Sequence, residues 1–154
     1  MRVVAIEEIP ASKVFKCREE PVPVPKDDEV VINVTATGVT KMDVLRSQFE
    51  YELPPDWNPV PGLQCSGTII DVGKDVHGWK CGDEVCALLN GGGYANAVVV
   101  RATQVLPLPV ADCINPVACL PEAACTTWEA LMRLCKLSAN MTLLVYERCG
   151  IICD

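Results

Sequence analysis

Cysteine is the residue type in this sequence that offers the most chemistry. Ten thiols could ligate a metal, form disulfides or act as nucleophiles, depending on their spacing. No two of them form a C-x-x-C pair, so neither a zinc ribbon nor a thioredoxin-type motif is indicated. The N-terminus, MRVVAIEEIP, does not resemble a secretory signal. We therefore interpret the thiols as reduced and mostly buried small apolar groups of a cytoplasmic protein; they stand at positions 17, 65, 81, 86, 113, 119, 125, 135, 149 and 153.

A few further positions could carry chemistry. Cys125 falls at the opening of a predicted helix, where the helix dipole could lower its pKa, although inert packing is the preferred interpretation. His77 is the only histidine and stands in a turn before Trp79, which is typical of a surface residue. Thr40 with Asp43 three residues later is a pattern that starts helices.

Length and charge limit the classes of partner. The chain has 154 residues, a length that fits one globular domain with an appendage. Its formal net charge is −7. An acidic chain is a poor match to nucleic acid or to an anionic membrane surface, because both are bound by clustered lysine and arginine. No apolar run approaches the 18 residues of a membrane span. We expect neither nucleic acid nor a membrane as partner.

The first part of the chain is predicted to form short strands with one short helix. Alternating apolar residues and glycine or proline turns indicate a compact, barrel-like β unit. The expected strands are residues 1–6, 29–36, 66–72, 83–89 and 94–100; the helix is 42–47, and 51–61 is an irregular, proline-rich loop.

After residue 107 the pattern changes. Residues 122–137 are predicted to be a helix, because Ala124, Trp128, Met132 and Cys135 recur at three- and four-residue steps. The sequence T-L-L-V at 142–145 predicts the start of a buried strand.

Eight short motifs occur in a fixed order, and together they are specific. They are P-x-P-x-P at 21–25, E-V-V-I at 29–32, A-T-G-V-T-K-M-D at 36–43, P-G-L-Q-C-S-G-T at 61–68, V-G-K at 72–74, G-D-E-V at 82–85, G-G-G-Y-A at 91–95 and P-E-A-A-C-T at 121–126. This series resembles the N-terminal half of the medium-chain dehydrogenase/reductase superfamily. It is most similar to the zinc-independent quinone oxidoreductases, in particular the p53-inducible group.

The resemblance implies a fold and an activity. The fold would be mainly β with helices: a partly open, GroES-like β-barrel plus a C-terminal linking helix, with the Rossmann domain of the family missing. We expect the GroES-like domain over residues 1–107, an inter-domain helical segment over 108–141, and the start of a nucleotide-binding domain with an unrelated tail over 142–154. Family enzymes transfer hydride from NADPH to a quinone or an enone, in the cleft between the two domains.

Zinc is not expected. Zinc-dependent relatives carry a cysteine and a histidine where this sequence has Thr40 and Leu63, and neither side chain is a usual zinc ligand. Residues 91–100 run through the region where such relatives insert a four-cysteine zinc loop. A hydride acceptor would then be polarised by hydrogen bonds or water.

The resemblance implies three site residues. Thr40 occupies the position of an asparagine near the nicotinamide ribose, and Thr126 that of a threonine near the cofactor at the opening of the inter-domain helix; each could instead simply cap its helix. Tyr51 corresponds to a tyrosine that lines the quinone cleft, or is a half-buried loop residue. Gln64 replaces a glutamate, and we assign it no catalytic role. Phe49 stands at a family glycine.

The residues after Val145 depart from the family. A glycine-rich turn and a helix would hold the cofactor pyrophosphate there, but only Gly150 is present. We therefore expect weak NADPH binding and describe the chain as a truncated isoform or fragment of an oxidoreductase without independent catalysis. The alternatives are a non-enzymatic GroES-like module that associates with full-length relatives, as a homo- or hetero-oligomer, and a poorly folding product.

Overall fold

The computed structural model describes residues 1–10, 12–48, 53–109 and 113–146. Its strands are β1 (Arg2–Ile9), β2 (Ser12–Glu19), β3 (Glu29–Thr37), β4 (Gln64–Val72), β5 (Glu84–Leu88), β6 (Ala97–Arg101) and β7 (Val105–Pro107). Its helices are α1 (Lys41–Ser47) and α2 (Leu120–Trp128), the short 3₁₀ turns η1 (Ala102–Gln104) and η2 (Pro116–Cys119), and a π-helical turn, η3 (Glu129–Leu134).

The strands form two antiparallel sheets. β1 and β2 make a hairpin, and the other five strands pair in the order β6-β3-β4-β5-β7. The five-stranded sheet is open, because β6 and β7 are its edges and are not paired with each other. This confirms the expected mainly β fold with open sheets and a C-terminal helix, and the described residues contain no Rossmann domain.

One face of the larger sheet forms the core. Apolar side chains alternate along the strands and pack against one another, which removes their surface from water. The central members of this cluster are Val30, Ile32, Cys65, Ile69 and Val85, each no more than 1% exposed. Burial raises the pKa of the Cys65 thiol to about 12, so this sulfur stays protonated and unreactive at neutral pH.

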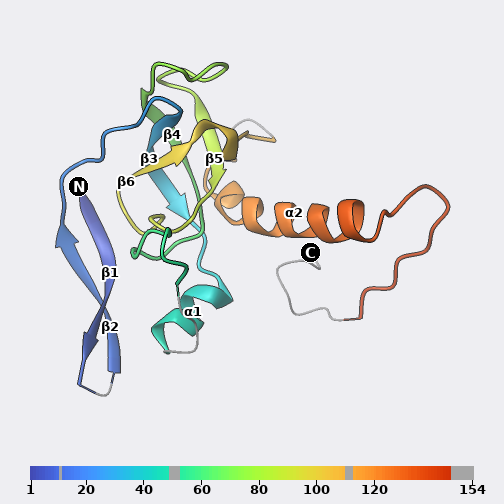
Figure 1. The fold of residues 1–154 in the computed structure, drawn as a ribbon, viewed down its shortest axis with the longest axis horizontal. Helices are drawn as coiled ribbons and strands as arrows, with labels where there is room; N and C mark the ends of the chain where they lie inside the picture. Colours follow the sequence, from blue (N-terminus) through green and yellow to red (C-terminus); the bar gives the residue numbers. More distant parts are fainter. Residues whose placement is uncertain (11, 49–52, 110–112, 147–154) are drawn as a thin grey trace.

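The hairpin and α2 lie at the periphery of this core. Figure 1 shows the hairpin beside α1 at one end of the molecule and α2 extending away from the sheet. The hairpin is joined to the larger sheet through residues 94–96: the Val4 backbone N–H donates to Tyr94 O at 2.7 Å, and the Asn96 N–H donates to Arg2 O at 3.0 Å. Both projecting elements expose part of their side chains to solvent.

Several sequence predictions are corrected by this arrangement. β2 was not predicted at all, and the strand expected at 94–100 begins only at Ala97, because residues 94–96 bond to the hairpin instead. Residues 142–145 form no strand: no neighbouring strand offers them hydrogen bonds, and Leu144 is 85% exposed. The helix predicted at 122–137 starts at Leu120 and ends, after its π turn, at Leu134.

The prediction that the thiols are mostly buried is wrong for half of the cysteines in the described residues. Cys65 and Cys86 are buried and Cys113 and Cys125 half-buried, whereas the other four are exposed: Cys17, Cys81, Cys119 and Cys135. Those four lie on the hairpin, in a turn and around α2, outside the sheet core. His77 is exposed, as predicted. Among the described helices, none has the length and apolar character needed to cross a bilayer.

Candidate functional site

Asp43, in the first turn of α1, is a buried carboxylate that accepts hydrogen bonds from three chain segments. Its Oδ2 accepts from the Thr40 backbone N–H at 3.0 Å and from Thr40 Oγ1 at 3.1 Å. Its Oδ1 accepts from the Gly62 N–H at 3.0 Å, and the Tyr94 hydroxyl is a further donor. Burial of a charge is costly unless it is hydrogen-bonded, and these donors offset that cost. The carboxylate thereby ties α1 to the loops on either side of it.

Gly62 brings its loop close to this carboxylate. Its φ is +96°, a backbone conformation that favours glycine. A Cβ at this position would lie 2.7 Å from the Cα of Gly93 and 2.7 Å from a ring carbon of Tyr94. Gly93 donates in turn from its N–H to Gly62 O at 3.0 Å. Residue 62 must therefore lack a side chain for the two loops to meet at Asp43.

Thr40 lies at the N-cap of α1 and forms a capping box with Asp43. Its side chain is buried, and its hydroxyl proton is directed at Asp43 Oδ2. In the capping box its oxygen also accepts from the Asp43 backbone N–H, which leaves one lone pair that can accept a hydrogen bond from a ligand. Thr40 therefore caps α1 in the structure, and its hydroxyl oxygen could contact a ligand only as a hydrogen-bond acceptor.

Gln64 and Glu122 join β4 to the start of α2. The buried Gln64 side chain accepts, through Oε1, from the Glu122 backbone N–H at 2.9 Å. The Gln64 amide also lies against Gly38, where an added Cβ would come within 2.5 Å of its Nε2. Gln64 therefore fixes where α2 begins relative to the sheet. Sequence reasoning gave Gln64 no catalytic role, and the structure gives it this positioning role.

Glu122 carries a carboxyl group that sequence reasoning missed. Its Oε2 is buried and has no hydrogen-bond partner among the described residues. Burial, and to a lesser degree the nearby Asp43 carboxylate, raises the pKa of Glu122 above the ordinary value. A neutral carboxyl can donate its proton in a hydrogen bond, which an ionised one cannot. The only sequence signal that could have pointed to this carboxyl group was the glutamate of the P-E-A-A motif.

We expect Glu122→Gln to change how stability depends on pH. Because the pKa of Glu122 is higher in the folded protein, its carboxyl keeps a proton at pH values at which the same group in the unfolded chain is already ionised. The free energy of unfolding therefore falls as the pH rises above the ordinary pKa of 4.5. The glutamine variant lacks this loss, and its free energy of unfolding should rise relative to wild type between about pH 4 and pH 7. Urea unfolding at several pH values measures the difference.

The matched control is Glu84→Gln, because Glu84 is exposed at the start of β5. Its difference from wild type should stay constant over the same pH range. A Glu122→Gln difference that is equally flat would contradict the raised pKa of Glu122.

The remaining predicted site residues are placed as follows. Thr126 lies on the exposed side of α2, in its second turn, so the prediction that it opens or caps the helix is wrong; the helix starts six residues earlier with Leu120-Pro121. Tyr51 and Phe49 lie outside the described residues. Leu63 is buried beside Gln64.

Within the described residues, no three His, Cys, Asp or Glu side chains are grouped so as to hold a metal ion.

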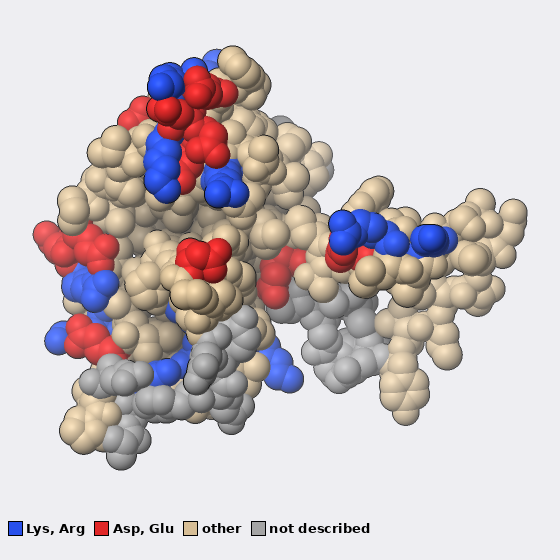
Figure 2. Space-filling model, viewed as in Figure 1, with Lys and Arg blue, Asp and Glu red and all other residues tan. Residues whose placement is uncertain are grey.

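An apolar surface adjoins this site on α2 and the segment that follows. We call it the α2 face, and it comprises Trp128, Met132, Leu134, Met141 and residues 143–146. Trp128 is 67% and Leu134 68% exposed, and Figure 2 shows the projecting element covered mainly by uncharged residues. Large apolar side chains exposed along one segment mark surfaces that contact another molecule or domain.

Comparisons with known proteins agree with this geometry. Residues 26–110 match the alcohol dehydrogenase GroES-like domain. The chain is 28% identical over 150 residues to a mouse protein named synaptic vesicle membrane protein VAT-1 homolog-like, covering 97% of this chain and 36% of that protein. It is 29% identical over 152 residues to the quinone oxidoreductase of Lama guanicoe, covering 97% of this chain and 46% of the enzyme.

The solved structures include an alcohol dehydrogenase superfamily protein from Novosphingobium aromaticivorans. It superposes with a TM-score of 0.85 at 25% identity, covering 99% of this chain and 48% of that one. The chain thus spans between about a third and a half of the length of these three proteins.

Proposed function

The chain belongs to the alcohol dehydrogenase GroES-like domain family, with VAT-1 proteins and quinone oxidoreductases of the medium-chain dehydrogenase/reductase superfamily among its relatives, and from this premise we propose that it forms the quinone-binding half of an NADPH-dependent quinone oxidoreductase. The observation that carries the proposal is the site itself: a Thr40 hydroxyl that keeps one lone pair, and a buried Glu122 Oε2 without a hydrogen-bond partner among the described residues. Glu122 lies in the first turn of α2, and Thr40 caps α1. We propose the cytoplasm as the compartment, as expected from the sequence.

The two ends of the cofactor fit these residues differently. NADPH, when bound, would supply hydride to the acceptor. The nicotinamide and its ribose require hydrogen-bond partners, and Thr40 Oγ1 can accept one bond from a ribose hydroxyl or the carboxamide. The pyrophosphate requires a glycine-rich turn at a helix N-terminus, and the described residues contain none. We propose that a Rossmann domain outside the described residues holds the phosphates.

The protein groups then act on the acceptor. A quinone carbonyl gains negative charge as it accepts hydride, and a donor already aimed at that oxygen stabilises it. Glu122, whose pKa is raised by burial and by Asp43, is the proposed donor in its protonated form. Gln64 holds the Glu122 backbone, and Asp43 holds Thr40, so neither donor nor acceptor has to be ordered when the substrate binds. Zinc has no role in this scheme.

The exposed apolar residues of the α2 face suit contact with a second domain. We propose that a nucleotide-binding domain packs on this face, which would bring Thr126 and Tyr51 to the cleft as cofactor and quinone contacts. The second candidate function, a non-enzymatic module that binds full-length relatives, uses the same face. Light scattering of the chain mixed with such a relative separates the two, because only the module forms a complex with an intact enzyme.

The experiment uses residues 1–141 joined to the nucleotide-binding domain of the Lama guanicoe enzyme, which we call the joined polypeptide. We expect Thr40→Val to lower its kcat/KM for tetramethyl-1,4-benzoquinone about two- to tenfold, the value of one hydrogen bond to an uncharged group. This quinone has no free ring position for thiol addition. Absorbance of NADPH gives the rate.

Thr35→Val is the matched control, since Thr35 is an exposed threonine of β3. It should leave kcat/KM unchanged. An undiminished rate in Thr40→Val would remove Thr40 from the proposed site.

A further inference from the structure

A concave site lies between the hairpin, β3 and α1, and Asp43 is part of its lining. This cavity has a volume of about 740 Å³, within the range of small-molecule sites in proteins. Its walls include Val3, Phe15, Val34, Val44 and Tyr94. Thr40, Gln64 and Glu122 do not line it, so it is separate from the proposed hydride-transfer site and shares with it only Asp43. We call it the hairpin pocket.

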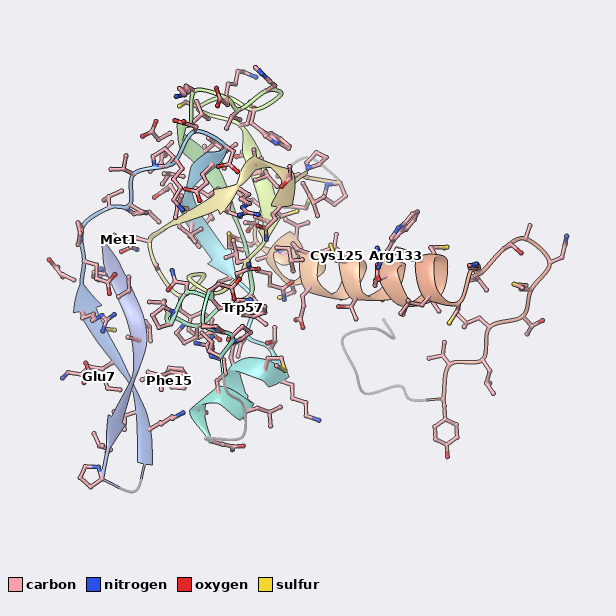
Figure 3. All side chains as sticks on the ribbon, in the orientation of Figure 1. Met1, Glu7, Phe15, Trp57, Cys125 and Arg133 are labelled. Carbon is pink, nitrogen blue, oxygen red and sulfur yellow. The ribbon has the colours of Figure 1, made fainter. Side chains whose placement is uncertain are left out.

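Aromatic rings form one wall of the hairpin pocket. The Phe15 and Tyr94 ring centroids are 6.4 Å apart with an interplanar angle of 41°, a tilted arrangement that leaves Phe15 half exposed. Figure 3 shows Phe15 on the side of the hairpin that faces α1, opposite Glu7. Ring surfaces of this kind are available for contact with a further ring.

The opposite wall is held rigidly. Val44 projects from α1 and is 46% exposed, and α1 is joined to β2 because Lys13 Nζ donates to Arg46 O at 3.4 Å. The Val34 N–H donates to Asn96 O at 2.9 Å, which fixes β3 against the segment that carries Tyr94. Each of the three surrounding elements is therefore connected to another by hydrogen bonds, and the site is largely preformed.

The charges of the lining indicate the class of ligand. Arg2 and Asp43 are its charged residues. The Asp43 oxygens are already occupied by Thr40, Gly62 and Tyr94, and Arg2 is exposed to solvent. Neither supplies a buried charge that awaits a counter-ion, whereas most of the wall is aliphatic or aromatic. An ionic ligand would lose its hydration there without compensation.

We propose that the hairpin pocket binds an uncharged aromatic small molecule, at a site distinct from the hydride-transfer cleft. The ring of the ligand packs against Phe15 and Tyr94, and its remaining apolar surface is covered by Val34 and Val44. This binding needs neither NADPH nor a second domain, so it can be tested on the chain itself and independently of the proposed function.

The test uses the uncharged fluorescent naphthalene Prodan as probe. Prodan emission should shift to the blue on addition of the full chain and saturate. Phe15→Asp and Val44→Asp place a charge on two different walls at half-exposed positions, and each should weaken binding at least tenfold. Ile70→Asp and Trp128→Asp are matched controls, because both residues are exposed and apolar but lie outside the pocket; they should bind as wild type does.

A second readout on the wild-type chain does not depend on any variant. Cys17 lines the pocket, whereas Cys81 is exposed elsewhere. Mass spectrometry of maleimide labelling should show that Prodan slows modification of Cys17 and leaves Cys81 unchanged. Equal affinity of Phe15→Asp and wild type, loss of binding in Trp128→Asp, or equal protection of both cysteines would overturn the proposal.

Discussion

Replacing Asp43 with alanine will destabilise the protein by about 3–5 kcal/mol, because several buried donors lose their acceptor at a cost of about 1–3 kcal/mol each. The carboxylate accepts from Thr40 and Gly62 at 3.0–3.1 Å and from the Tyr94 hydroxyl. Alanine would leave these donors in a buried site without an acceptor, and each unpaired donor costs free energy. Urea unfolding monitored by tryptophan fluorescence gives the change in free energy directly.

Asp56→Ala is the matched control for this experiment. Asp56 is exposed in the loop that follows α1, so its loss should change stability by no more than about 0.5 kcal/mol. If Asp43→Ala cost as little as Asp56→Ala, the carboxylate would not be what ties α1 to the neighbouring loops.

The second large effect is expected at Gly62. Its φ of +96° and the 2.7 Å approach of an added Cβ to the Gly93 backbone act together, so Gly62→Ala should cost about 3 kcal/mol. The loop cannot relax without moving the Gly62 N–H away from Asp43. The free energy of unfolding measures this cost, and the amide resonance of residue 62 should lose its hydrogen-bonded shift.

Gly78→Ala separates the two contributions. Gly78 has a similar φ of +91°, but nothing lies within 4 Å of its added Cβ. Only the backbone strain remains there, so the expected cost is about 1 kcal/mol. Equal effects of the two substitutions would mean that the close approach at Gly62 has no energetic weight.

The sequence was sufficient for elements whose pattern is local. The segment 66–72, followed by the turn at Gly73-Lys74, predicted a strand, and the structure has it at Gln64–Val72. The Thr40–Asp43 spacing predicted α1 to within a residue of its observed start at Lys41. Such elements are specified by their own side chains, since the buried face and the cap are written in consecutive residues.

Other elements depend on contacts that are distant in sequence. β2 mixes charged and apolar residues without strict alternation and is held by pairing with β1, while residues 94–96 bond to the hairpin rather than extend β6. The segment 142–145 shows the converse, because its strand-like pattern has no partner strand. Pairing energy comes from the neighbour, and a single segment cannot reveal it.

The candidate site was predicted in part. The motifs identified Thr40, whose buried place beside Asp43 the structure gives in detail, but they did not reveal the unpartnered Oε2 of Glu122. That feature arises only when α2 is placed on the sheet by Gln64, 58 residues earlier in the chain. The role of Asp43 similarly depends on the approach of Gly62 and Tyr94, which no local pattern encodes.

The most direct test of the proposed function is NADPH oxidation by the joined polypeptide, compared with the nucleotide-binding domain alone, using tetramethyl-1,4-benzoquinone and a metal chelator throughout. If the chain supplies a zinc-independent hydride-acceptor site, the joined polypeptide will oxidise NADPH faster than the domain alone. NADPH deuterated at the transferred position will then react more slowly. A rate equal to that of the isolated domain, or a rate abolished by the chelator, would contradict the account.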